Sequence, residues 1–374
     1  MNPPVTTYIA LGSNQGNRFD YLQKAVDAIF SEIGSVTTLS SVYETPSWGF
    51  DGNDFLNACL SVDTYYPAEK VLQKLLEIET RFGRQRHGDG FANRSLDLDV
   101  LFYGQQQLNT ETLTLPHPHI AKRRFVLQPL ADIAADFIHP TLNKSISSLL
   151  KTTADDGEIA VQATRLTRPT VNFDRLNFLA IEGNIGAGKT SLAHMISHEF
   201  KAKLITERFK DNPFLPKFYE NRARYAFPLE MSFLADRYQQ LVEDIGQFDL
   251  FKDFVVSDYD IYKSMIFAQV TLQKEENLLY KRLFNIMYKD LAKPDLYIYL
   301  YQNTERLLQN IKKRGREYEQ NIPVDYLKDI NQGYLNFIRT QEHLKTKIID
   351  ISELDFIANR EDYLNLIEAI TAEL

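Results

Sequence analysis

The first 110 residues alternate between strand-like apolar runs and helical spacing. An apolar run at Tyr8–Leu11 predicts a strand, and apolar residues from Phe19 to Ile33 recur at three- and four-residue steps, which predicts a helix. Two further strand-like runs lie near residues 36–43 and 55–65. Pro67 fits the first turn of a second helix, because that position needs no backbone N–H.

A last strand is predicted over residues 96–103, after a stretch rich in Gly, Arg and Asn at residues 83–93 that predicts a loop. Strands and helices thus mix at short, hairpin-like spacings. This pattern is typical of an α+β sandwich.

Apolar periodicity weakens over residues 151–175, which predicts a linker, and then restarts with a strand at Phe178–Glu182. We place the boundary near residue 170 and predict domains at residues 1–150 and 176–374. The length of 374 residues agrees with this division, since domains usually run to roughly 100–200 residues.

Composition excludes several classes of protein. With 44% hydrophobic and 25% charged residues, the chain is neither collagen-like, coiled-coil nor wholly disordered. No apolar run approaches about 18 residues and no basic, then apolar, N-terminal segment occurs, so we expect neither a transmembrane helix nor a signal peptide. The single cysteine, Cys59, excludes an intrachain disulfide and is expected in the core, which suits a reducing cytoplasm.

The net charge of −8 is divided evenly along the chain. Residues 1–150 hold 12 basic and 16 acidic residues, and residues 151–374 hold 30 and 34. Neither half is basic, which argues against a domain that binds nucleic acid. A few placed arginines can still bind a discrete phosphate group.

The segment from Gly183 to Thr190 fits the phosphate-binding P-loop pattern, and it lies between a predicted strand and a predicted helix. Its glycines let backbone N–H groups surround phosphate oxygens, Lys189 can reach the β- and γ-phosphates, and the Thr190 hydroxyl can bind Mg²⁺. No Asn-Lys-x-Asp motif follows, which argues against a GTPase. The predicted ATP-binding residues here are Gly183, Asn184, Ile185, Gly186, Ala187, Gly188, Lys189 and Thr190.

Further motifs extend over nearly all of residues 176–374, namely Glu207 after an apolar run, Asp211–Leu215, Leu229–Tyr238 and Lys312–Gln320. With the P-loop, they resemble the deoxynucleoside kinase family. The resemblance implies an α/β P-loop kinase fold with a parallel sheet, and ATP-dependent 5′-phosphorylation of a deoxynucleoside.

The resemblance also implies a role for each matching residue. Glu207 would accept the proton of the sugar 5′-hydroxyl with Arg237 beside it, and Arg314 and Arg316 would close over the phosphates. The implied sugar-binding residues are Tyr219 and Glu319, and the implied Mg²⁺ ligands are Thr190 and Asp258. A solvated basic helix end is the alternative for the arginines.

Two positions depart from the family pattern. Glu230 stands where many members have Gln, and a carboxylate can accept from both N1–H and the 2-amino group of guanine. This favours deoxyguanosine, with an ordinary surface carboxylate as the alternative. Tyr259 stands where many members carry Arg, so that the contact of this arginine is missing.

In the N-terminal half, Asp97 and Asp99 lie two residues apart on a predicted strand and therefore point to the same side. Adjacent carboxylates repel unless a cation lies between them, and Mg²⁺ together with phosphates would satisfy both. An exposed edge of a half-buried strand is the alternative.

The motifs around this pair resemble 6-hydroxymethyl-7,8-dihydropterin pyrophosphokinase over about residues 5–150. They are Gly12–Asn14, Ser41–Pro46, Asp54–Ala58, Gly83–Arg86, Asn93–Asp99 and Leu115–Pro118. The resemblance implies a ferredoxin-like α+β sandwich that moves a diphosphate from ATP to the pterin hydroxymethyl group and releases AMP.

The resemblance implies that Asp97 and Asp99 bind two Mg²⁺ ions. It also implies that Arg84 and Arg94 stabilise the β-phosphoryl group during transfer. His117 and Arg123 would contact the phosphates of ATP. The implied pterin-binding residues are Thr45, Pro46, Phe55, Asn57 and Phe125, with the two phenylalanines stacking on the ring. Phe91 departs from the family pattern, and we assign His119 no role.

We therefore expect a bifunctional phosphotransferase that uses ATP and Mg²⁺ on two small-molecule substrates. The alternative is one active domain beside a nucleotide-binding regulatory or scaffold module. Channelling between the sites is disfavoured, because their substrates are not successive in one pathway. Aromatic-rich helical segments near residues 227–241 and 267–288 fit either a homodimer interface, which this kinase family commonly has, or ordinary core packing.

Overall fold

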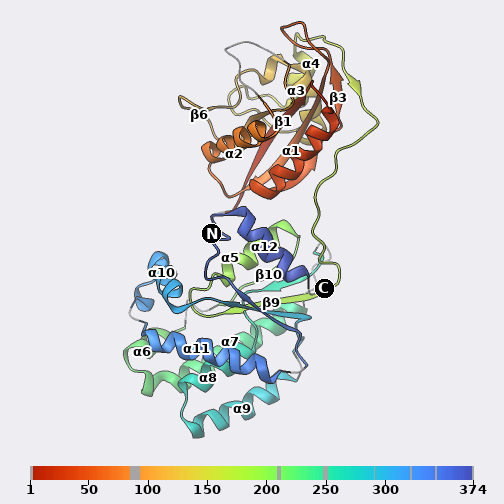
Figure 1. The fold of residues 1–374 in the computed structure, drawn as a ribbon. Helices are drawn as coiled ribbons and strands as arrows, with labels where there is room; N and C mark the ends of the chain where they lie inside the picture. The colour runs from red at the N-terminus through yellow and green to blue at the C-terminus, as the bar shows by residue number, and fades with distance from the viewer. Residues whose placement is uncertain are drawn as a thin grey trace. The chain divides into compact units, whose positions relative to one another are not determined.

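A computed structural model of the chain describes residues 3–84, 93–208, 212–246, 252–289, 291–320, 322–341 and 343–372 (Figure 1). They fold as two units, with the main division between Thr170 and Val171. The Phe91 departure lies outside the described residues. None of the described helices combines the length and apolar character that crossing a membrane requires.

The first unit is built on one antiparallel sheet in the order β5-β1-β4-β3-β8, in which β2 also pairs with β4. Its strands are β1 (Val5–Ser13), β2 (Ser35–Leu39), β3 (Tyr43–Thr45), β4 (Phe55–Thr64), β5 (Asp97–Tyr103) and β8 (Ala160–Val161). A separate ribbon joins β6 (Leu108–Asn109) to β7 (Thr114–Leu115). The helices are α1 (Arg18–Glu32), α2 (Ala68–Arg81), η1 (Ile120–Lys122), α3 (Arg124–Ala134) and α4 (Ile146–Thr152).

Side-chain alternation along the strands gives this sheet two buried faces. Ile9 and Leu11 of β1 pack with the apolar residues of α1 and α2, whereas Tyr8 and Ala10 pack with those of α3 and α4. Cys59 of β4 is fully buried in the second cluster, as predicted, and burial raises the pKa of its thiol. An α+β sandwich with helices on both faces results.

Two predicted boundaries differ from the structure. The single run predicted near residues 36–43 is two strands, β2 and β3, which pair with different parts of β4. The predicted linker is partly structured, because Ala160 and Val161 form the edge strand β8, which pairs with β3. A two-residue strand carries too little periodicity to be seen in the sequence.

The second unit contains a five-stranded, fully parallel sheet in the order β10-β11-β9-β12-β13. This confirms the predicted parallel α/β sheet. The strands are β9 (Phe178–Gly183), β10 (Lys203–Ile205), β11 (Val255–Ser257), β12 (Leu296–Tyr301) and β13 (Thr346–Asp350). The helices in this part of the chain are α5 (Lys189–Glu199), α6 (Leu215–Glu220), α7 (Arg222–Gly246), α8 (Tyr262–Thr271), α9 (Lys274–Tyr288), α10 (Thr304–Arg314), η2 (Glu317–Glu319), α11 (Val324–Thr340) and α12 (Arg360–Thr371).

The helical segment predicted over residues 267–288 is broken between α8 and α9. Gln273 accepts a hydrogen bond from the backbone of Glu276, whose side chain accepts from the backbone of Gln273. This capping box satisfies the free N–H groups of a new helix, so α9 starts there although the apolar spacing continues.

Candidate active sites

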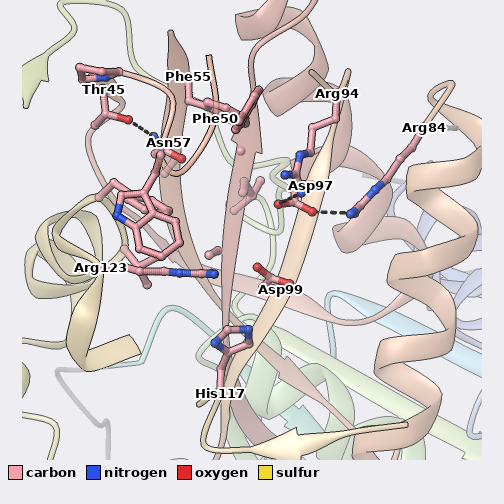
Figure 2. A pocket seen from close by; sticks show the side chains of 18 residues that line it. Thr45, Phe50, Phe55, Asn57, Arg84, Arg94, Asp97, Asp99, His117 and Arg123 are labelled. Carbon is pink, nitrogen blue, oxygen red and sulfur yellow. Dashed lines mark hydrogen bonds and ion pairs between the residues drawn. The ribbon is translucent and has the colours of Figure 1, made fainter. Parts of the chain in front are cut away.

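In the first unit, the eleven predicted site residues all line one cavity (Figure 2). β3 supplies Thr45, β4 supplies Phe55 and Asn57, and β5 supplies Asp97 and Asp99. The other predicted residues are Pro46, Arg84, Arg94, His117, Arg123 and Phe125. Three sheet strands and the start of α3 thus bring together residues that lie up to 80 positions apart in the sequence. The role of each of these residues stays a prediction.

Asp97 and Asp99 point to the same side of β5, as the two-residue spacing predicts, while Leu98 and Val100 lie in the core. Arg84 and Arg94 contact the Asp97 carboxylate at 2.6 Å and 2.8 Å. Burial, and then the charge of Asp97, raises the pKa of Asp99 to about 7. The pair therefore favours a bound cation.

This donor set fits Mg²⁺. Mg²⁺ prefers oxygen ligands and usually keeps waters and phosphates beside one or two carboxylates. Within the described ranges no group of three or more His, Cys, Asp or Glu could hold a metal by itself. Two aspartates completed by phosphate oxygens satisfy the requirement without such a group.

Arg84 is anchored by a residue that sequence reasoning missed. The buried carboxylate of Glu79, on α2, accepts from the Arg84 guanidinium and from the backbone N–H of Leu98 at 2.7 Å. Because Leu98 lies between the two aspartates, Glu79 links α2 to the strand that presents them. Nothing in the local sequence around Glu79 indicates this contact.

Two aromatic residues of the cavity, Trp48 and Phe50, were also missed. The Arg123 guanidinium lies 5.1 Å from the Trp48 ring centroid and 5.8 Å from that of Phe125, within the range of cation–π attraction. Asn57 donates to the Thr45 hydroxyl at 2.8 Å (Figure 2). Trp48 is the only tryptophan of the chain and follows Thr45 and Pro46 closely, which was the available signal.

His117 contributes a neutral ring at physiological pH. Burial lowers its pKa to about 4, and the charge of Arg123 lowers it further. It can therefore bind a phosphate oxygen through a hydrogen bond but adds no charge.

In the second unit, the P-loop lies between β9 and α5, as predicted, with Gly186 and Gly188 at φ values of +86° and +84°. Asn184 donates at 2.7 Å to the Leu327 carbonyl and at 2.7 Å to the Asn331 side chain. Asn310 donates to the Gly186 carbonyl at 2.9 Å. Helices α10 and α11 thus hold the loop in shape.

The cavity beside the P-loop is lined by twelve predicted site residues, Ile185, Gly186, Lys189, Thr190, Glu207, Tyr219, Glu230, Arg237, Asp258, Arg314, Arg316 and Glu319. Lys189 donates to the carbonyls of Gly183 and Asn184 at 2.8 Å and 2.9 Å. Thr190 donates to the Asp258 carboxylate, which also accepts from the backbone N–H of Glu207 at 2.8 Å. These hydroxyl and carboxylate oxygens fit the ligand preference of Mg²⁺.

Glu207 is an ionised carboxylate between two cations. Arg237 donates to its Oε1 atom at 2.8 Å and 2.6 Å, and Lys263 donates to its Oε2 atom at 2.5 Å. Burial alone would raise its pKa, but the charges of Lys263 and Arg237 hold the pKa well below the usual range. Lys263 received no role from the sequence, although it lies in the segment that contains Asp258.

Glu230 is not a surface carboxylate, since its side chain is only 2% exposed. Its Oε1 atom accepts from the Thr271 hydroxyl at 3.0 Å, while its Oε2 atom has no hydrogen-bond partner among the described residues. Burial raises its pKa to about 7. An unpartnered acceptor in a cavity is suited to a ligand that donates hydrogen bonds.

Arg314 and Arg316 both contact the buried carboxylate of Glu319, with Arg316 at 3.1 Å. Glu319, which the sequence assigned to the sugar, therefore also holds the two arginines at the cavity. Both arginines line the cavity, which favours the predicted role over a solvated basic helix end.

Comparisons with known proteins agree with the two sites. The family model "Deoxynucleoside kinase" matches residues 179–374, and the model "7,8-dihydro-6-hydroxymethylpterin-pyrophosphokinase (HPPK)" matches residues 8–135. The deoxyguanosine kinase of Bacillus subtilis is 39% identical over 190 residues, which cover 50% of this chain and 92% of the relative.

The 2-amino-4-hydroxy-6-hydroxymethyldihydropteridine pyrophosphokinase of Aquifex aeolicus is 34% identical over 142 residues, 38% of this chain and 88% of the relative. Among solved structures, a deoxyadenosine kinase from M. mycoides is 25% identical with a TM-score of 0.45, over 52% of this chain and 100% of that one.

Proposed function

The chain belongs to two families, the deoxynucleoside kinases through residues 179–374 and the hydroxymethyldihydropterin pyrophosphokinases through residues 8–135, and from this premise we propose what each site does. It is a bifunctional kinase that uses ATP at both sites. In our proposal, the first unit transfers a diphosphate to 6-hydroxymethyl-7,8-dihydropterin and releases AMP. The second transfers the γ-phosphoryl group to a deoxynucleoside, deoxyguanosine in preference, and releases ADP.

For the first unit, the supporting observation is the aspartate pair beside Arg84 and Arg94 in an aromatic cavity. Asp97 and Asp99 would hold Mg²⁺, which when bound neutralises phosphate charge and orients ATP. Arg84 and Arg94 would then stabilise the transferred β-phosphoryl group.

The remaining cavity residues of this unit would bind the two substrates. His117 and Arg123 would bind ATP phosphates. The pterin would lie against Phe55 and Phe125, with its polar edge near Thr45, Pro46 and Asn57.

For the second unit, the supporting observation is the ionised Glu207 in the cavity that P-loop residues also line. Glu207 would accept the proton of the 5′-hydroxyl, and Arg237 would keep the carboxylate in place. Thr190 and Asp258 would hold Mg²⁺, which when bound neutralises the phosphates. Tyr219 and Glu319 would bind the sugar, while Arg314 and Arg316 would bind the phosphates.

The preference for deoxyguanosine depends on Glu230. Its free Oε2 atom and its Oε1 atom can accept from the two adjacent donors of guanine, N1–H and the 2-amino group. Adenine and cytosine would place a ring-nitrogen acceptor against the carboxylate. The relatives with deoxyguanosine kinase activity in their names agree with this preference.

We also infer the finer architecture of both units. In the first, the order β5-β1-β4 with β2 and β3 beyond β4 agrees with a ferredoxin-like sandwich. In the second, exposed apolar residues of α9 at Leu278, Leu279 and Ile286 favour a homodimer. Light scattering would then give twice the chain mass of 43.3 kDa, and L278D/L279D would give the single mass.

The test of function is an assay of the full chain with ATP and, separately, the hydroxymethyldihydropterin and each of the four deoxynucleosides. AMP with the pterin and ADP with deoxyguanosine are the expected products. ADP formation alone would contradict the N-terminal activity, and AMP formation alone the C-terminal one. A clear preference for thymidine would contradict the role of Glu230.

A further inference from the structure

No positive charge lies at position 259, where many deoxynucleoside kinases carry arginine. Tyr259 is fully buried, and within the described ranges its hydroxyl has no hydrogen-bond partner. A tyrosine phenol is neutral at physiological pH and supplies no cation. If the kinase site keeps this positive charge, another residue must supply it.

Lys263 brings a cation into the cavity from one helical turn further along the chain. It lies in the first turn of α8, is 8% exposed, and lines the cavity together with Lys189, Thr190 and Glu207. Its ammonium group donates to Glu207 Oε2 at 2.5 Å. The lysine thus contacts the proposed base in the cavity that P-loop residues also line.

Arg237 and Lys263 both neutralise Glu207, and they contact different oxygen atoms of its carboxylate. Arg237 already pairs with Glu207 through two hydrogen bonds to Oε1, and its third contact is to the Ser264 hydroxyl at 2.6 Å. An ammonium group has three N–H donors. In the described part of the chain, the Lys263 ammonium group donates a hydrogen bond to Glu207 alone. Two of its N–H donors therefore remain for a ligand.

The neighbourhood of Lys189 indicates which ligand these donors fit. Lys189 and Lys263 line the same cavity, and each ammonium group lies within electrostatic range of the other. Two buried ammonium groups in range of one another repel. Phosphate oxygens between them would replace that repulsion by attraction, and the P-loop lysine is the residue that contacts the β- and γ-phosphates.

We propose that Lys263 is a catalytic residue that binds the γ-phosphoryl group during its transfer, and so supplies the cation that position 259 lacks. The inference rests on the proposed kinase function of the second unit. In the step, the bond from the γ-phosphorus to the β,γ-bridging oxygen breaks and the bond to the sugar 5′-oxygen forms. The hydroxyl proton passes to Glu207, ADP leaves, and Lys263 stays protonated throughout.

The test compares the full wild-type chain with K263M, K263R and the control K328M, which removes a lysine 60% exposed on α11. Each is assayed with the deoxynucleoside that the wild type phosphorylates fastest. K263M is expected to lower kcat about 100- to 1000-fold, while the KM for the deoxynucleoside changes less than about threefold. K263R should recover kcat to within about tenfold of the wild type, because the charge returns. K328M should match the wild type.

Formation of AMP at the N-terminal site measures the amount of intact chain in each sample. A kcat of K263M within about threefold of the wild type would overturn the inference. So would a K263R variant as slow as K263M, since the loss would then come from packing rather than from charge. If the wild-type chain forms no ADP with any deoxynucleoside, the proposed function itself is wrong, which is a distinct result.

Discussion

Glu230 is a single carboxyl whose protonation state determines what it can bind. When ionised it only accepts hydrogen bonds, and when protonated it also donates one. Burial raises its pKa to about 7, against the opposing charges of Arg237 and Lys263, with Glu207 adding to the rise. The group therefore changes state within the physiological pH range.

We predict that the KM for deoxyguanosine falls as pH rises from about 6 to about 8. The carboxyl loses its proton as pH passes its pKa of about 7, and only the carboxylate can accept both guanine donors. Steady-state kinetics across this range measure the effect. A KM that is flat or rises with pH would contradict the assignment.

The substitution E230Q removes the titration and keeps the shape. We expect kcat/KM for deoxyguanosine to fall about 10- to 100-fold, because the amide N–H₂ group replaces an acceptor and opposes a guanine donor. The pH dependence of the KM should disappear in the same variant. Kinetics with deoxyadenosine serve as the comparison, since an amide can pair with the donor and acceptor of adenine and the loss should be smaller there.

At the scale of elements, α5 begins after an N-cap residue in the left-handed region. Gly188 has φ +84°, and a Cβ atom there would lie 2.9 Å from the Phe356 ring. Left-handed backbone costs a residue with a side chain roughly 1–2 kcal/mol, and the ring would have to move as well. Both effects distort the N–H groups that surround the phosphate.

We predict that G188A raises the ATP KM of ADP formation about tenfold or more and leaves AMP formation unchanged. G104A is a matched control, because Gly104 also has a positive φ, +52°, and a Cβ atom there would lie 3.1 Å from Val5. Gly104 lines neither of the two cavities. G104A should affect thermal unfolding but neither KM. An unchanged ATP KM in G188A would show that the loop tolerates the strain.

For the whole molecule, the two sites predict separable activities. D97N removes the charge that Arg84 and Arg94 contact, and we expect AMP formation to fall about 100- to 1000-fold with ADP formation unchanged. K189M should have the reverse effect. The rates of AMP formation and of ADP formation are measured separately for each variant. Loss of both activities in either variant would indicate coupled units and contradict this prediction.

Sequence alone determined the features that depend on neighbours along the chain. The P-loop was predictable because its glycines, Lys189 and Thr190 are consecutive and lie between a strand and a helix. Asp97 and Asp99 were predictable as a pair because alternate residues of a strand point to one side. The parallel sheet of the second unit was predictable only through the resemblance of its motifs to the deoxynucleoside kinase family.

Tertiary structure decided what depends on packing between distant segments. Glu79 on α2 reaches Leu98 on β5, and Trp48 in a loop reaches Arg123, across spans that no local pattern records. The burial of Glu230, which raises its pKa, comes from elements that pack around α7. Packing likewise places Lys263 in the cavity that P-loop residues line. Sequence thus identified the residue types and their local order, while three-dimensional packing determined their charge states and partners.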